Sequence, residues 1–192
     1  QLAFADVIPP LKALLEDPAT LKVGQNPKYD MVVLAAHGIA IAPFDDTMLL
    51  SYALAAGSHG HGMDELSARH LGHTPITFGE VAGKGSFAAV PLDRATAYAA
   101  EDADVTLRLH GILKPRLWAE RVTRTYELCD RPLVPVLADM ERAGIKVDVA
   151  ELQRLSAEFA ADMARLEEVA HTEAGERFTL GSPKLLGDIL FG

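Results

Sequence analysis

Tyr98 and Asp102 stand four positions apart in the segment AYAAEDADVTLRLHGIL, residues 97–113. A spacing of four places both side chains on one face of a helix. The other members of that face are apolar: Val105, Leu109 and Ile112. An unpaired carboxylate in such a core-facing seam costs several kcal/mol, so Asp102 requires a metal ion, another cation or hydrogen bonds. A carboxylate that ligates a divalent cation, beside a phenol that hydrogen-bonds the attacking water, is suited to hydrolysis by metal-bound water.

The alternative for Asp102 is a solvated acid near the start of the helix, whose role Glu101 or Asp104 shares. Glu101 and Asp104 are expected on the opposite face of the helix. Arg108 follows Asp104 by four residues, which predicts a surface ion pair. The spacing alone leaves both interpretations of Asp102 open.

Four further residues could take part in chemistry, but the position of each one in its helix or turn explains its residue type equally well. Asp30 falls in the first turn of an expected helix, where the helix dipole favours an acid without any function. Gln25 and Asn26 precede that helix as turn and cap residues, and Pro27 suits its first position. Phe78 opens another short helix and fits a core position as well as a stacking surface.

Two other patterns do not support a site. The loop GSHGHG places His59 and His61 near Asp64, but H-x-H without a further close ligand is weak evidence for zinc. Lys84 between two glycines lacks the spacing of a phosphate-binding loop.

Composition excludes several classes of protein. The 192 residues are 49% hydrophobic and 23% charged, as in soluble proteins of one or one and a half domains. No apolar run is long enough for a membrane span, and the first residues lack the pattern of a secretory signal. The single cysteine fits a reducing cytoplasm. The net charge of −9 argues against a general polyanion-binding surface, although metal ions can supply positive charge at a catalytic site.

Hydrophobic periodicity and cap residues predict a chain dominated by helices. Strands are expected at 21–25 and 39–44, and a third short strand after Gly144. The partners of the strand at 21–25 are expected upstream of residue 1, because two isolated strands make a marginal sheet. The helices are expected at 6–16, 27–37, 47–56, 63–71, 97–117, 132–143 and 149–175, with a last one starting at Ser182-Pro183.

Five stretches in order closely resemble the 3′–5′ exonuclease domain of bacterial family A DNA polymerases: LKVGQNPKYD, FDDTMLLSY, HGMDELSARHLGH, ITFGEVAGKG and YAAEDADVTLRLH. Within them, Tyr98-x-x-x-Asp102 is similar to the third exonuclease motif of that family and Asn26-x-x-x-Asp30 to its second. The segment 132–192 resembles the start of the polymerase domain. The resemblance therefore implies an exonuclease domain at 1–125 and the base of a polymerase thumb at 126–192.

This resemblance implies a fold class and a reaction. The fold would be α/β and ribonuclease-H-like, truncated without its first strands, and followed by a mostly helical segment. The reaction would be proofreading hydrolysis of a DNA 3′ end by two divalent metal ions, Mg²⁺ or Mn²⁺ with Zn²⁺ as an alternative. The parent would serve DNA replication and repair as a cytoplasmic monomer that contacts no membrane.

Site roles follow from the same resemblance, residue by residue. Asp102 would ligate the metal on the side of the nucleophile, and Tyr98 would orient the attacking water. Asp30 would help to hold the second metal through its outer shell. Phe78 resembles a residue that stacks on the bases of a frayed single strand. Gln25, Asn26 and His61 are the candidates for polar contacts to that strand.

The sequence departs from the family pattern at its beginning. The first motif, D-x-E on an early strand, is absent and is expected upstream of residue 1. Two of the four metal-binding carboxylates would then be missing, so the chain alone is expected to be inactive. An alternative is an exonuclease-like module without activity that supports the polymerase domain; the retention of Asp30, Tyr98 and Asp102 favours an active parent.

Overall fold

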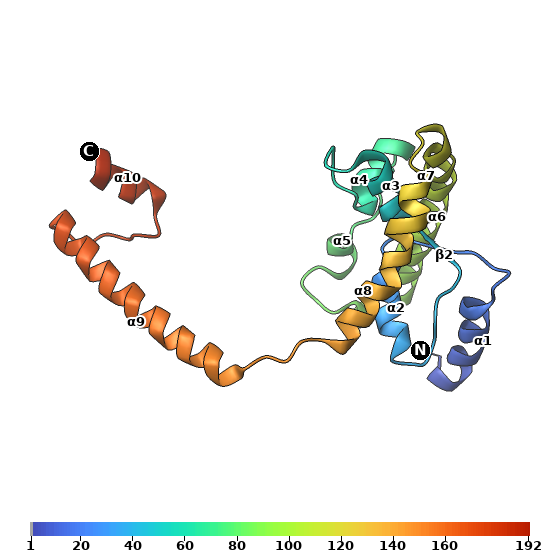
Figure 1. Ribbon diagram of the computed structural model, residues 1–192, viewed down its shortest axis with the longest axis horizontal. Coiled ribbons are helices and arrows are strands. Elements are labelled where there is room, and N and C mark those ends of the chain that lie inside the picture. Colours follow the sequence, from blue (N-terminus) through green and yellow to red (C-terminus); the bar gives the residue numbers. More distant parts are fainter. Residues whose placement is uncertain (1) are drawn as a thin grey trace. The chain divides into compact units, whose positions relative to one another are not determined.

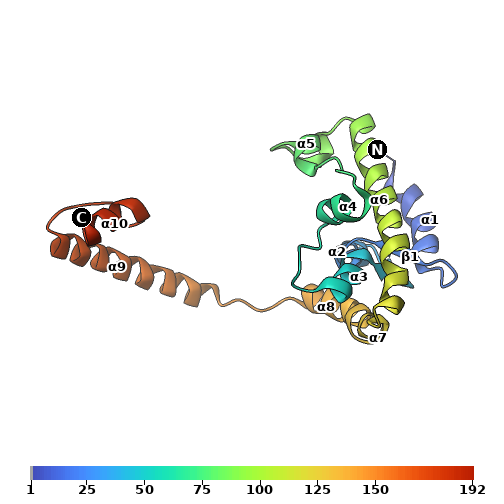
Figure 2. The ribbon, with the colours of Figure 1, turned by 90° about the horizontal axis from the view of Figure 1, so that it is seen from above.

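The computed structural model describes residues 2–192, which divide after Gly144 into two compact units. Figures 1 and 2 show the elements of both units along the chain. The first unit contains α1 (Phe4–Glu16), β1 (Lys22–Gly24), α2 (Pro27–Ala35), β2 (Phe44–Asp46), α3 (Thr47–Ala55), α4 (Met63–Leu71), α5 (Phe78–Ala82), η1 (Phe87–Ala89), α6 (Leu92–Ala119), α7 (Thr123–Thr125), η2 (Tyr126–Asp130) and α8 (Arg131–Ala143).

A small parallel sheet lies in the first unit. β1 pairs with β2, with Val23 opposite Asp45, and α2 connects the two strands. The strand expected at 21–25 is therefore present in shorter form. The expected strand at 39–44 is displaced to Phe44–Asp46. Pro43 has no N–H to donate to a ladder, and only its carbonyl oxygen joins the pairing, by accepting from the Lys22 N–H at 3.0 Å. The expectation that the partners of β1 lie only upstream of residue 1 is wrong, since β2 pairs with it.

The core of the first unit is built on the long helix α6 (Figures 1 and 2), against which α3 and α4 pack. Its buried members from these three helices and η2 are Leu50, Leu66, Val105, Leu109, Leu113, Leu117 and Tyr126. The seam of α6 therefore repeats every four residues from Val105 to Leu117. Ile112, which the heptad-like spacing assigns to the seam, is exposed because the actual seam passes through Leu113.

A buried acid fastens β2 to the end of α6 and to the turn that follows. Asp45, 1% exposed, accepts hydrogen bonds from His110 Nε2 at 2.8 Å and Lys114 Nζ at 3.0 Å. The Tyr126 hydroxyl and Arg131 Nη1 donate to it as well, at 2.9 and 3.1 Å. Burial would raise the pKa of Asp45, but the hydrogen bonds from His110, Lys114 and Tyr126 together lower it below its usual value.

The helix ends follow the capping residues in most places. Asp46 caps α3, and Thr77 and Glu80 form the expected capping box of α5. Asn26 is different from expectation. It adopts the left-handed conformation, with φ 56° and ψ 51°, and its side chain makes no capping hydrogen bond to α2.

Two other expectations near the end of the first unit are corrected. Helix α6 begins at Leu92, five residues before the expected start, because Pro91 supplies its N-cap position. The residues after Gly144 form no strand, and α9 begins directly at Val149. The first unit also extends to Gly144, since α8 packs on α2. The proposed division at 125/126 stays a prediction.

The second unit contains α9 (Val149–Ala174) and α10 (Pro183–Phe191), as expected. Asp148 caps α9 by accepting from the Glu151 N–H at 3.0 Å, and His171 Nε2 lies 2.8 Å from the carbonyl oxygen of Phe178. The apolar residues of α9 are mostly exposed, among them Leu152, Phe159, Met163, Leu166 and Val169. Within residues 2–192, no helix combines the length and apolar character that a membrane crossing needs.

Candidate functional site

One open hollow of about 540 Å³ in the first unit brings together three of the residues singled out from the sequence. Gln25 from the turn after β1, Asp30 from the first turn of α2 and Asp102 from α6 all line it. The remaining wall is mostly apolar: Leu21, Val23, Gly24, Met63, Ala103, Thr106 and Leu107. Two acids that are 72 positions apart in the chain therefore share one cleft.

Asp102 lies half-buried in this cleft with an unsatisfied oxygen. Its Oδ1 is buried and has no hydrogen-bond partner within the described residues. Burial raises the pKa of Asp102; the neighbouring Tyr98 hydroxyl lowers it, and the charges of Glu101 and Asp64 raise it further. The net effect is a raised pKa, which is what a carboxylate without a counter-ion shows. A cation at Oδ1 would satisfy the oxygen and compensate the charge.

Tyr98 is one turn before Asp102 and faces the same acid. Burial raises the pKa of the Tyr98 hydroxyl, and the adjacent Asp102 carboxylate raises it further. The phenol therefore stays protonated at neutral pH and can donate a hydrogen bond. Tyr98 does not line the hollow itself but lies beside it, through its contact with Asp102.

Asp30 lines the same hollow and is exposed to solvent. Partial desolvation by the surrounding wall raises its pKa, and a hydrogen bond with its own main-chain N–H lowers it in part. Neither Asp30 nor Asp102 has an ion-pair partner among the residues that the structure describes. The two free carboxylates fit a divalent cation, which prefers oxygen ligands.

The described residues do not form a complete metal cage. Within 2–192, no group of three or more histidine, cysteine or acidic side chains is placed to hold a metal ion. The site thus offers two carboxylates from this chain, Asp30 and Asp102. His59, His61 and Asp64, weighed from the sequence as zinc ligands, do not form such a group either.

The turn after β1 is held by hydrogen bonds rather than left free. Gln25 Nε2 donates to the carbonyl oxygen of His61 at 2.8 Å, and Thr47 Oγ1 donates to Gln25 Oε1 at 2.5 Å. The Asn26 N–H donates to Asp46 Oδ1 at 3.0 Å. Both ends of the Gln25 amide are therefore engaged inside the protein, so a contact to a substrate would have to replace one of these bonds.

His61 lies next to this turn but outside the lining of the hollow. Its Nδ1 is 2.8 Å from Ser51 Oγ, and its ring meets Tyr52 edge-on with 5.5 Å between centroids. Burial lowers the pKa of His61 and the neighbouring His59 lowers it further, while the charge of Glu65 opposes them in part. His61 is thus neutral at pH 7, and its side chain packs on α3.

Phe78 is 51% exposed and belongs to a cluster of three aromatic rings. Its ring centroid is 6.0 Å from that of Phe87, with the planes inclined by 22°, and 6.5 Å from that of Tyr98. Phe87 also contacts Tyr98, at 5.9 Å between centroids. Phe78 is therefore a surface residue beside Tyr98. The sequence did not indicate Phe87, because it lies in the short helix η1 directly after a glycine-rich loop, where no hydrophobic periodicity marks it.

Of the two acids near Asp102, Glu101 has a role that the sequence did not indicate, whereas Asp104 forms the expected ion pair. Glu101, expected on a solvated face, accepts from the main-chain N–H of Ile76 at 2.6 Å and lies 2.8 Å from His73 Nε2. It therefore fastens the segment before α5 to α6, and the expectation of a featureless surface acid is wrong. The expected surface pair of Arg108 and Asp104 is present at 3.3 Å.

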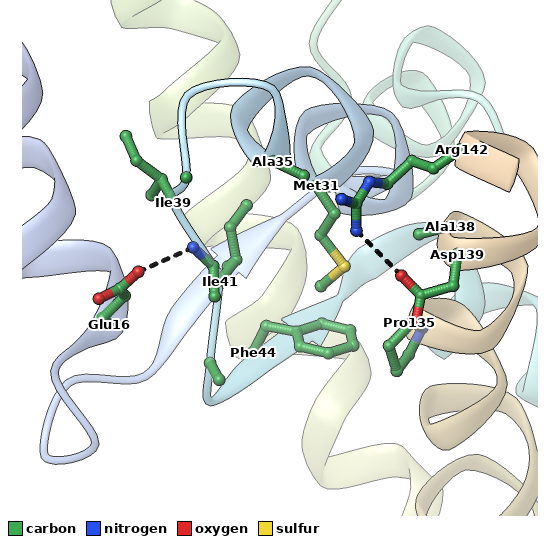
Figure 3. A pocket seen from close by; sticks show the side chains of 13 residues that line it. Glu16, Met31, Ala35, Ile39, Ile41, Phe44, Pro135, Ala138, Asp139 and Arg142 are labelled. Atoms are coloured by element: carbon green, nitrogen blue, oxygen red, sulfur yellow. Dashed lines mark hydrogen bonds and ion pairs between the residues drawn. The ribbon is translucent and has the colours of Figure 1, made fainter.

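A second cavity lies away from these carboxylates. It measures about 430 Å³ and is formed by α2, residues 38–44 and α8 (Figure 3). Its wall is largely apolar, with Met31, Ile39, Phe44 and Pro135 among the side chains drawn. Its polar groups are engaged: Glu16 accepts from the Ala40 N–H at 3.0 Å, and Arg142 pairs with Asp139 at 3.1 Å. Nothing in this cavity supports chemistry.

Curated relatives match the entire chain. DNA polymerase I of Rhizobium leguminosarum is 58% identical over 196 residues, and that of Pseudomonas aeruginosa is 47% identical over 199 residues. Both alignments cover 100% of this chain but 19% and 22% of the relatives. The chain thus spans about a fifth of the length of these proteins.

Solved structures give the same result at the level of fold. The polymerase domain of Pol1 from M. smegmatis, in complex with DNA primer-template and dNTP, aligns with a TM-score of 0.75 and 26% identity. That alignment covers 100% of this chain and 31% of the other. Brucella melitensis NrnC aligns at 22% identity with a TM-score of 0.62, over 73% of this chain and 68% of its own, which shows similarity of fold alone.

A family model described as 3′–5′ exonuclease, of the A-type DNA polymerases, matches residues 1–118, which include Asp30, Tyr98 and Asp102. The match covers β1, α2, α4 and most of α6, the elements that contribute residues to the lining of the acidic hollow. The chain therefore belongs to the 3′–5′ exonuclease domain family of bacterial DNA polymerase I.

Proposed function

We propose that this chain is part of a DNA polymerase I, in which residues 1–125 contribute to a metal-dependent 3′–5′ proofreading exonuclease and residues 126–192 begin the polymerase domain. The observation that supports the exonuclease is the shared hollow of Asp30 and Asp102, with Asp102 Oδ1 buried and unsatisfied. Membership of the exonuclease family supports the reaction type.

The proposed fold of the exonuclease part is ribonuclease-H-like. The observation that supports this fold is a β-α-β unit at the site: the parallel strands β1 and β2 are connected through helix α2. Additional strands that carry the D-x-E motif would pair at the free edge of β1. They would bring two more carboxylates toward the hollow, because β1 ends at the turn that lines it.

The chemistry needs divalent cations, Mg²⁺ or Mn²⁺ with Zn²⁺ as an alternative. When bound, two such ions stabilise the attacking and leaving oxygens of an in-line displacement at phosphorus. Asp102 and Asp30 are the residues of this chain that would hold them, Asp102 directly and Asp30 through the outer shell. The raised pKa values of both acids reflect a site that lacks a compensating charge in the chain itself.

The other side chains would bind and orient the DNA strand and the water. The Tyr98 hydroxyl, protonated and beside Asp102, donates a hydrogen bond to the attacking water. Phe78 stacks on an unpaired base of the 3′ end, a contact that tolerates any sequence. Gln25, Asn26 and His61, at or beside the rim of the hollow, contact the sugar and phosphate groups of the strand.

The substrate is the single-stranded 3′ end of DNA, and the parent acts in replication and repair as a cytoplasmic monomer. The 192 residues alone are expected to have little or no nuclease activity. Two-metal hydrolysis requires the cations to be fixed in place, and this chain supplies only two of the four carboxylates of the family pattern.

The test compares Asp102→Ala with Asp104→Ala in the full-length polymerase that contains this sequence. Asp104 is exposed and lies two positions from Asp102, so it controls for a lost acid on α6. With a 3′-labelled single strand and Mg²⁺ or Mn²⁺, Asp102→Ala should lose nearly all hydrolysis, whereas Asp104→Ala should retain it. Equal hydrolysis by both variants would show that the reaction does not depend on Asp102 and would overturn the proposed role of this site. No hydrolysis in the unsubstituted protein would support an exonuclease-like module without activity.

The isolated chain gives a second test with the same labelled strand. Degradation that disappears in Asp102→Ala would show that the carboxylates of this chain suffice. The proposal that a D-x-E motif is required would then be withdrawn, while the exonuclease function would stand.

A further inference from the structure

Asp46 occupies the point where β2, α3 and the turn after β1 meet. Its Oδ1 accepts from the main-chain N–H groups of Met48 at 2.9 Å and Leu49 at 3.4 Å, which caps α3. The same oxygen accepts from the N–H of Asn26 at 3.0 Å. Only 1% of Asp46 is exposed, so these bonds are formed away from water. A helix cap alone would not require the third bond.

The third bond reaches the residue at which the chain changes direction. Asn26 adopts the left-handed conformation, which asparagine tolerates better than most residues other than glycine. Its side chain does not cap α2, and its main chain is held on both sides: the N–H donates to Asp46 Oδ1, and the carbonyl oxygen accepts from the Tyr29 N–H at 3.2 Å. Pro27 follows as the first residue of α2 and is buried, and Asp30 comes in the first turn. The direction in which α2 leaves β1 therefore depends on Asp46.

Thr47, the next residue, acts on the other side of the same turn. Its hydroxyl donates to Gln25 Oε1 at 2.5 Å and lies 3.1 Å from the carbonyl oxygen of Gly24. Thr47 is fully buried. Two consecutive side chains at the start of α3 thus hold Gly24, Gln25 and Asn26, which connect the sheet to the helix of Asp30.

We propose that Asp46 is a positioning residue for the exonuclease site, which places Asp30 and the Gln25–Asn26 turn opposite Asp102. The inference rests on the proposed function and adds a residue to it. Asp46 does not line the hollow and acts through the main chain of Asn26. Its importance for the reaction comes from geometry, because a misplacement of about 1 Å at a reacting centre can reduce the rate about 100-fold.

Asp46→Ser separates the two roles of this side chain. Serine caps helices about as well as aspartate, so α3 keeps its N-cap. The serine oxygen is one bond closer to the main chain and cannot also reach the Asn26 N–H. In the metal-free protein, amide hydrogen exchange should then accelerate at least about tenfold at Asn26 and remain slow at Met48. Asp46→Asn, which keeps an acceptor at the same distance, should preserve both amides.

The kinetic test uses the full-length polymerase with saturating single-stranded DNA. Asp46→Ser should lower kcat by about 10- to 100-fold and raise the Mg²⁺ concentration for half-maximal activity several-fold, because Asp30 is displaced. Asp46→Asn should restore most of the activity. Leu117→Ala, a buried core change at the far end of α6, should reduce stability while kcat stays within about twofold.

The outcomes distinguish this inference from the proposed function. If Asp102→Ala is inactive but Asp46→Ser keeps its kcat and Mg²⁺ dependence, Asp46 is a helix cap only and the inference is overturned. The same holds if exchange at Asn26 is unchanged in the metal-free protein. If Asp102→Ala keeps its activity, the proposed function fails, and the exchange experiment still tests the link between Asp46 and Asn26. Should Asp46→Ser not fold, Asp46→Thr, whose hydroxyl also caps helices and is likewise one bond closer to the main chain, replaces it in both measurements.

Discussion

At the scale of single residues, two neighbouring buried acids behave in opposite ways. Asp45 faces three basic side chains and the Tyr126 hydroxyl, which overcome its burial and lower its pKa. For Asp46, burial is the largest effect and raises the pKa to about 6, although the N–H groups of Asn26, Met48 and Leu49 oppose it. The charge of Asp45 raises the pKa of Asp46 further. One acid is thus charged in the folded state, and the other titrates near neutrality.

The raised pKa of Asp46 predicts a pH dependence of stability. The folded state binds the proton of Asp46 more tightly than the unfolded state, whose carboxyl has the ordinary value of 3.8. The free energy of unfolding should therefore fall as pH rises from about 4 to above 6, by on the order of 3 kcal/mol for this group. Asp46→Asn removes this titrating group. In urea unfolding, the free energy of unfolding of Asp46→Asn minus that of the unsubstituted chain should therefore increase as pH rises from about 4 to above 6. A difference that does not change with pH would contradict the prediction.

Phe78 allows a second prediction at this scale. In the full-length polymerase, Phe78→Ala should raise KM for a single-stranded oligonucleotide about 5- to 150-fold, since one stacked base contributes about 1–3 kcal/mol. Trp118→Ala is the matched control, an aromatic residue that is 83% exposed at the other end of α6. A loss of folding in Phe78→Ala with unchanged KM of the remaining folded protein would show that Phe78 supports the cluster with Phe87 and Tyr98 instead.

At the scale of elements, α6 connects the site to the rest of the first unit. Its first half bears Tyr98 and Asp102, and its second half bears His110 and Lys114, which bind Asp45 in β2. Lys114 also pairs with Glu127 in η2 at 2.7 Å. The position of Asp102 along its axis is therefore set by contacts that lie beyond the hollow.

Tyr126→Phe should destabilise the first unit by about 1–3 kcal/mol. The ring stays and leaves no cavity, but the lost hydroxyl would leave the Asp46 N–H, now 2.9 Å from it, buried without a partner. Urea unfolding followed by circular dichroism measures the change. Tyr29→Phe, at a side chain that is 70% exposed, should change the free energy of unfolding by less than about 0.5 kcal/mol. Equal effects of the two substitutions would exclude this role of the Tyr126 hydroxyl.

The elements also show what local sequence can predict. The helices α3, α4, α9 and α10 follow periodicity and caps, because their signals lie within the elements. The sequence pattern predicts the second strand too early, at 39–44. The reason is that Asp45 and Asp46 are unusual strand residues whose hydrogen-bond partners are distant in sequence. The common cleft of Asp30 and Asp102 follows from resemblance to a family. Neither residue spacing nor composition could predict that Asp30 and Asp102 lie in the same cleft.

At the scale of the whole molecule, the two units differ in how much apolar surface they bury. The first has a core along α6, whereas α9 buries only His171 among its residues. A single helix with an unburied apolar face is stabilised mainly by its own hydrogen bonds, which are marginal in water. The units are therefore expected to differ in local stability.

Hydrogen exchange of the 192-residue chain measures this difference. Amides of Val105, Leu109 and Leu113 should exchange through global unfolding, whereas those of residues 152–166 in α9 should exchange at least about 100-fold faster. Cleavage near 145 should leave the protection of α6 unchanged, since the first unit ends there. Uniform protection of both segments would mean that α9 is covered in solution.

The length of α6 sets an angular tolerance for the site. Asp102 and Lys114 are twelve residues apart on this helix, which corresponds to about 18 Å at 1.5 Å per residue. A catalytic group must stay within about 0.5 Å of its productive position. Over that distance, a displacement of about 0.5 Å corresponds to a change in tilt of about 2°. The hydrogen bonds and ion pairs of Asp45 must therefore hold the tilt of α6 to within about 2°. Under the proposed function, substitutions at His110 or Arg131 are therefore expected to lower activity by changing the tilt of α6, although every residue of the acidic hollow is still present.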